Sequence, residues 1–112
     1  MRHNNDKKIV YIVGPITSSD KPDMNRGAFE KAESMLELRY NVINPWRNYG
    51  GGRDNATHAM QTTYMRLSFH QLLCVDAIYI LAGWKRSPNC EAEVVVAKCL
   101  ALEVVYAAAA EK

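Results

Sequence analysis

The polar residues most able to do chemistry in this chain follow an apolar run at 77–81. A short polar loop after the run leads into a predicted helix that begins near Cys90. Open α/β sheets bind ligands outside the carboxyl ends of their strands, because helix N-termini and loop amides meet there. This arrangement places Ser87, Glu91 and Glu93 where a ligand or a reaction is expected.

Glu93 is the strongest candidate of the three. A carboxylate near the first turn of a helix can be held ionised by the helix amides and act as a nucleophile or a base. The simpler alternative is a glutamate that only complements the helix dipole. Glu91 stands two residues earlier and therefore points to another side of the helix, which predicts a solvated side chain.

Other candidate side chains have a structural alternative. Ser87 could bind a phosphate oxygen, but a serine before a helix more often serves as its N-cap. Tyr11 belongs to the core unless its hydroxyl reaches the crevice. Asp76, at the start of a predicted strand, is interpreted as structural. His58 and His70 are isolated, and the three cysteines form no CxxC pair, so we expect no metal site and no cofactor.

Apolar patterning predicts the elements that would position these residues. Four strands are expected, at 8–13, 42–43, 77–81 and 103–106. Three helices are expected between them, beginning near Asn25 as an N-cap, near Ala59 and near Cys90. The alternation predicts a single α/β domain, residues 1–112, with a parallel sheet.

Three further segments allow specific expectations. The helix from Ala59 is predicted to bury a stripe that includes Leu67, Leu72 and Leu73. Glycines 50–52 favour a flexible loop or lid over a phosphate cradle, since the lysine and Ser/Thr of a P-loop are missing. The final residues, AAAAEK, predict a frayed end or a helical extension.

Composition excludes several classes of function. Fourteen basic and twelve acidic residues give a net charge of +2, and the basic residues are scattered, so we expect no nucleic-acid polymer as a partner. No apolar run is long enough to span a bilayer, and the odd cysteine count does not suit a secreted disulfide framework. A soluble, cytoplasmic protein is expected.

Several short motifs together resemble one known family, the nucleoside 2-deoxyribosyltransferase-like proteins, and in particular their short bacterial and phage branch. The motifs are YIVGPIT at 11–17, NxxAF at 25–29, VINP at 42–45, YM at 64–65 and LLCVDAIYILAGWKRS at 72–87 with ExxxA at 93–97. The resemblance implies a flavodoxin/Rossmann-like three-layer sandwich with a four- or five-stranded parallel sheet. It also implies a homodimer or higher homo-oligomer, whose neighbouring subunit often completes the active site.

The resemblance also implies a reaction and roles for residues. Members cleave the N-glycosidic bond of 2-deoxynucleosides or their monophosphates. By position, Glu93 corresponds to the nucleophile, Tyr11 to the tyrosine that orients it, and Gly14 with Pro15 to the loop under the sugar. Ser87 corresponds to a serine that binds phosphate in the monophosphate hydrolases.

Two substrate-binding positions differ from the family pattern. Ser68 stands where relatives usually carry an aspartate that positions the sugar or base, and Asn89 stands in place of a glycine, after Pro88. These differences leave three hypotheses open. The protein is an N-glycosidic bond enzyme acting on a nucleoside or nucleotide, a non-catalytic nucleotide-binding protein of the same fold, or a homo-oligomeric scaffold without a ligand.

Overall fold

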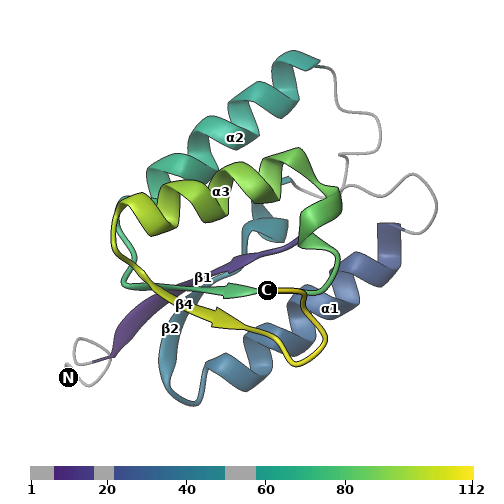
Figure 1. Ribbon diagram of the computed structural model, residues 1–112. Coiled ribbons are helices and arrows are strands. Elements are labelled where there is room, and N and C mark those ends of the chain that lie inside the picture. The colour runs from purple at the N-terminus through teal and green to yellow at the C-terminus, as the bar shows by residue number, and fades with distance from the viewer. Residues whose placement is uncertain (1–6, 17–21, 50–57) are drawn as a thin grey trace.

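The structure, a computed structural model, describes residues 7–16, 22–49 and 58–112 (Figure 1). Its sheet contains four parallel strands, β1 (Lys8–Val13), β2 (Tyr40–Ile43), β3 (Ala77–Ile80) and β4 (Glu103–Tyr106), in the order β2-β1-β3-β4. β2 and β3 lie on opposite sides of β1, so the order of the strands reverses there, and ligands of open α/β sheets bind at the carboxyl ends of the strands beside such a reversal. The glycine segment 50–52 lies outside the described residues.

Helices cover both faces of the sheet, which makes a three-layer sandwich (Figure 1). The helix α1 (Pro22–Leu36) lies on one face, and α2 (His58–Leu72) and α3 (Pro88–Cys99) lie together on the other. Two short 3-10 helices, η2 (Pro45–Tyr49) and η4 (Trp84–Arg86), follow β2 and β3. The predicted α/β flavodoxin/Rossmann-like class is confirmed. Within the described residues, no helix is long and apolar enough to cross a membrane.

The side chains of β1 alternate between the two cores. Tyr11 and Val13 pack with α2 and α3, whereas Val10 and Ile12 pack with α1. Successive side chains of a strand point to opposite faces, so a strand covered on both sides must be apolar throughout. Because of this alternation, the Tyr11 side chain lies on the face of the sheet that α2 and α3 cover.

The predicted helix boundaries need correction. The helix α1 begins at Pro22, so Asn25 lies within it and is not its N-cap. Proline suits the first helical turn because it has no amide hydrogen to satisfy. The helix α3 begins at Pro88, two residues before the predicted Cys90, and this shift moves Glu93 into the second turn.

The predicted apolar stripe of α2 is also wrong in part. Leu72 is fully buried, but Leu67 and Leu73 are exposed, and the buried side of the helix instead includes Ser68. Leucines that are exposed singly are common on protein surfaces, whereas a buried serine requires a hydrogen-bond partner. The partner of Ser68 belongs to the candidate site.

The last residues, 107–112, are neither frayed nor helical. Ala110 N donates to Ala107 O at 2.9 Å, which closes a turn. Trp84 Nε1 then donates to Glu111 O at 2.7 Å, and Lys85 Nζ donates to Lys112 O at 2.7 Å. Alanine propensity for helix is outweighed by these contacts, which hold the segment against η4.

Candidate functional site

The strand β1 and the helix α3 bring Tyr11 and Glu93 together in the interior. The Tyr11 hydroxyl donates a hydrogen bond of 2.9 Å to Glu93 Oε2. Tyr11 is 0% exposed and Glu93 is 6% exposed. A buried carboxyl group that is held by a phenol hydroxyl has a defined orientation, because the hydrogen bond constrains one of its two oxygens.

The periodicity of α3 explains why Glu93 points inward. Cys90, Glu93, Val94 and Ala97 are all buried, at the three- and four-residue spacing that puts side chains on one helix face. Glu91 is exposed, as the sequence predicted. Glu93 therefore replaces an apolar residue on the inner stripe of α3.

Ser68 completes the group from α2. Its side chain forms a hydrogen bond with the Glu93 carboxyl group, and the residue is 1% exposed. Three elements distant in sequence thus contribute one polar group each to the same buried point. Of the predicted site residues, the structure brings Tyr11, Ser68 and Glu93 into direct contact.

Burial raises the pKa of Glu93 from 4.5 to about 7, and the hydrogen bonds from Tyr11 and Ser68 oppose this rise. The carboxylate form loses solvation in the interior, and two neutral donors replace only part of it. The expectation that helix amides hold Glu93 ionised is wrong, because burial outweighs the groups that favour the carboxylate and leaves its pKa raised. Near neutral pH, both the acid and the carboxylate are populated.

A buried thiol lies one turn before Glu93. Burial raises the pKa of Cys90 to about 12, with smaller contributions from Glu93 and Glu91, while a hydrogen bond with Ser87 opposes the rise. Cys90 is therefore a neutral thiol at physiological pH and not a nucleophile. The sequence indicated neither a metal site nor a disulfide framework for the cysteines, and the three-residue spacing of Cys90 from Glu93 was the available signal for its burial on the same helix face.

Ser87 is the N-cap of α3, since its hydroxyl oxygen accepts from Cys90 N at 3.3 Å. The capping interpretation is confirmed, and binding of a phosphate by Ser87 stays a prediction. Asn89 lies exposed in the first turn of α3. Both residues follow β3 in sequence, on the side of the sheet where its strands end.

Gly14 and Pro15 lie where β1 ends and meet the segment that follows β3. A Cβ atom added to Gly14 would lie 2.8 Å from Leu81 Cδ1 and 3.1 Å from Leu81 Cβ, so a larger residue here would require Leu81 to shift. Pro15 lines an apolar cavity of about 430 Å³ between α1 and the sheet. Glu93 and Tyr11 belong to the opposite face, so this cavity and the Glu93 group are separate features.

Asp76 has the structural role predicted for it. Its Oδ2 accepts from Ile9 N at 2.8 Å, and its backbone amide donates to Ile9 O at 2.9 Å. Glu103 N donates to Asp76 O at 3.1 Å. Asp76 thus connects the start of β3 to β1 and β4, far from the carboxyl edge.

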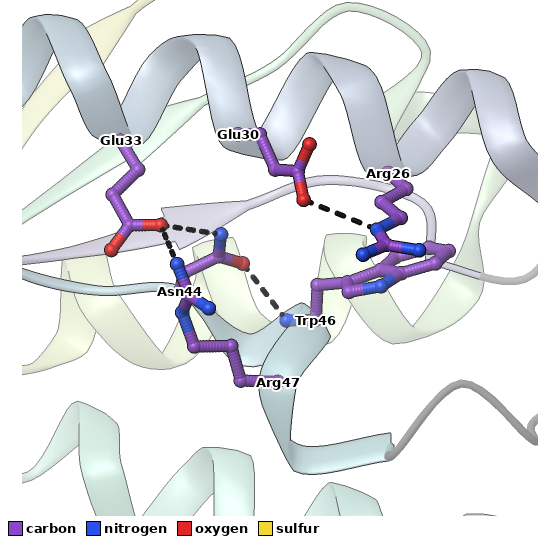
Figure 2. A network of polar contacts seen from close by, with 6 residues as sticks. All are labelled: Arg26, Glu30, Glu33, Asn44, Trp46 and Arg47. Atoms are coloured by element: carbon purple, nitrogen blue, oxygen red, sulfur yellow. Dashed lines mark hydrogen bonds and ion pairs between the residues drawn. The ribbon is translucent and has the colours of Figure 1, made fainter.

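A second polar network, which sequence reasoning missed, holds η2 beside α1 (Figure 2). Glu33 Oε1 accepts from Asn44 Nδ2 at 3.0 Å and pairs with Arg47, while Asn44 Oδ1 accepts from Trp46 N at 3.0 Å. An asparagine before proline that bonds two residues ahead is a recognisable turn pattern. The network fixes the path of the chain after β2.

Among the described residues, no group of three His, Cys, Asp or Glu side chains that could hold a metal ion is present.

Comparison with known proteins assigns the chain to a family. No curated protein matches the sequence. The family model described as a domain of unknown function (DUF4406) matches residues 8–106, nearly the whole chain, and the protein therefore belongs to this family.

Proposed function

We propose that the protein cleaves or transfers at the N-glycosidic bond of a 2-deoxynucleoside or its 5'-monophosphate, with Glu93 as the nucleophile. The observation that supports this proposal most is the 2.9 Å hydrogen bond from Tyr11 to Glu93 in the interior beside the carboxyl edge of the sheet. The resemblance to the nucleoside 2-deoxyribosyltransferase-like proteins supplies the reaction, since both residues match its motif.

The step uses one oxygen of the Glu93 carboxylate. This oxygen attacks the anomeric carbon of the deoxyribose while the bond to the base nitrogen breaks, and the base takes the electron pair and a proton from water. The resulting glycosyl ester is then attacked by water or by a second base, which releases the carboxylate. Retaining glycosidases use a carboxylate in the same way.

The environment of Glu93 suits a nucleophile that works near neutral pH. A carboxylate whose pKa is about 7 is a stronger base and nucleophile than one at 4.5, yet it is still half ionised at neutral pH. Tyr11 donates to Oε2 and thereby fixes the orientation of the carboxylate. Activity should therefore rise with pH through about 7.

Ser87 and the first turn of α3 are the proposed place for a 5'-phosphate. The N-terminus of a helix offers backbone amides to an anion, and Ser87 is only partly buried there. Asn89 is exposed on the same turn and is available to a ligand. Gly14 and Pro15 would contact the sugar from the end of β1.

A second candidate function is nucleotide binding without turnover. Ser68 stands at the position of the family aspartate, and its hydrogen bond with Glu93 already occupies its buried side chain. No carboxylate from this position is then available to the sugar or base. A ligand could occupy the site while the glycosidic bond stays intact.

Incubation with individual deoxynucleosides and their monophosphates, followed by chromatography of the free bases, distinguishes the candidates. The enzyme releases base, and Glu93→Gln abolishes the release while Glu91→Gln, an exposed change two residues away, preserves it. Mass spectrometry of the quenched protein should detect a deoxyribosyl ester in the native protein alone. Full activity in Glu93→Gln would reject Glu93 as the nucleophile.

Thermal stabilisation by a nucleotide without base release would favour the binding protein. In that case Ser68→Asp, which restores the family residue, tests whether turnover was lost at this position. A complete lack of both base release and stabilisation would reject both candidates. We also propose that the protein is cytoplasmic, since its three cysteines are unpaired. We further propose a homo-oligomer, because in the family that the motifs resemble a neighbouring subunit often completes the active site. Light scattering would measure the oligomeric state.

A further inference from the structure

The apolar cavity between α1 and the sheet is the feature that the Glu93 group does not explain. It has a volume of about 430 Å³, within the range of small-molecule sites. Its wall is formed by apolar side chains of α1 and of the segments after the strands, among them Ala28, Phe29, Leu81 and Ala107. The sheet separates it from Glu93.

One buried polar atom in the cavity wall lacks a partner. Asn25 Nδ2 is shielded from solvent, and among the described residues it is the one buried side-chain nitrogen or oxygen without a hydrogen bond. Leaving a buried amide donor unpaired is unfavourable, because the group has lost its bonds to water without a replacement. Asn25 also lines the cavity, so a turn of its side chain would bring Nδ2 to an acceptor on a ligand there.

The charge of the lining selects among ligands. Of the described residues that line the cavity, Lys31 alone is charged, and none is acidic. Lys31 is exposed on the same helix as Asn25 and Ala28, which places its ammonium group at the rim. An anion is therefore favoured over a cation, and the mostly apolar wall disfavours a ligand with many polar atoms, such as a nucleobase.

We infer that this cavity binds a small apolar carboxylic acid, whose carboxylate accepts a hydrogen bond from Asn25 Nδ2 and whose hydrocarbon body packs on Met35 and Leu81. The site would include neither Glu93 nor Tyr11, which belong to the other face of the sheet. Its contacts with Pro15 and Leu81 reach the segments that follow β1 and β3, so its occupancy can influence the carboxyl edge of the sheet.

Three probes that share a phenyl ring on a three-carbon chain test the inference: 3-phenylpropionate, its neutral amide and 3-phenylpropylamine. Titration of the full chain, followed by the Asn25 side-chain amide signals in nitrogen-15 NMR spectra, should give saturable binding that is tightest for the acid and weakest for the amine. Glu93→Gln should bind the acid as the native chain does, so failure of the proposed function would leave this result unaffected.

Two variants address the cavity itself. Asn25→Asp should weaken binding of the acid by roughly tenfold or more, because a hydrogen bond to a charged group is replaced by repulsion. Ser34→Asp adds the same charge on exposed α1 surface outside the lining and is the matched control. Ala28→Phe fills the cavity from an exposed position and should abolish binding without unfolding the protein.

Several outcomes would overturn the inference. These are tighter binding of the amine than of the acid, acid binding that survives both Asn25→Asp and Ala28→Phe, and no perturbation of the Asn25 amide at millimolar acid. A dimer that Ala28→Phe dissociates, in a protein that binds no acid, would assign the cavity to a second copy of the chain instead.

Discussion

Tyr11 donates its hydroxyl hydrogen to Oε2 of Glu93 at 2.9 Å, and this contact joins residues 82 positions apart, on β1 and α3. Burial raises the pKa of the carboxyl group to about 7 even though two side-chain hydrogen bonds favour its ionised form. Within the described part of the chain, no ion pair of Glu93 offsets the charge. The group is therefore sensitive to pH, and its properties can be tested separately from any activity.

Stability should fall as the pH rises from about 4.5 to about 7. Glu93 has a folded-state pKa of about 7 against 4.5 when unfolded, so the folded state holds the proton more tightly. The resulting stabilisation is fully present below pH 4.5 and is lost above 7, and its size is on the order of 3 kcal/mol. Urea unfolding at pH 5 and pH 8 would measure it.

Glu93→Gln provides the control for this pH dependence, because glutamine stays neutral. We expect this variant to be more stable than the native protein at pH 8, by roughly 1–3 kcal/mol, and to show a flatter pH profile. Glu91→Gln, an exposed change, should keep the native profile. If Glu93→Gln retained the native pH dependence, the assignment of the shifted group would fail.

Tyr11→Phe should raise the pKa of Glu93 further above 7. The variant removes a donor that favours the carboxylate but leaves the ring, and therefore the burial, in place. It should also cost about 1 kcal/mol of unfolding free energy, the usual contribution of one hydrogen bond. Carbon-13 NMR titration of the glutamate carboxyl signals would report the shift, and an unchanged or lower pKa would contradict it.

Two substitutions in the η2 network should differ in cost. Asn44 is 6% exposed and bonds through both its nitrogen and its oxygen, so Asn44→Ala should lower the free energy of unfolding by about 1–3 kcal/mol. The Arg47 side chain is 65% exposed, so Arg47→Ala should cost at most about 1 kcal/mol. Denaturant unfolding would measure both, and equal losses would mean that Asn44 does not anchor η2.

Ser87→Ala should destabilise the protein by about 1 kcal/mol, because the first turn of α3 loses its N-cap. Ser87→Thr, which keeps a hydroxyl acceptor, should restore most of this loss. Thermal unfolding of both variants would test the capping role. The same variants test whether Ser87 also binds the 5'-phosphate. If Ser87→Ala reduces the preference of the protein for monophosphates over nucleosides, Ser87 contacts the phosphate, because the loss of a helix cap would not by itself change this preference.

The order of the elements and several roles follow from local patterns in the sequence. Apolar runs predict all four strands of the described sheet, and the predicted last strand coincides with β4, Glu103–Tyr106. Helical spacing distinguishes Glu93 from Glu91, and Asp76 is interpreted correctly as structural. These predictions succeed because the period of a strand or a helix is a property of neighbouring residues.

The tertiary structure decides what depends on distant segments. The hydrogen bonds of Ser68 on α2 and Tyr11 on β1 with Glu93 depend on how these elements pack together. Burial then raises the pKa of Glu93 to about 7, although the sequence predicted an ionised side chain. Packing likewise leaves the Asn25 amide inside an apolar cavity and holds the residues 107–112 against η4. Desolvation is set by everything that surrounds a group, so no local pattern in the sequence contains it.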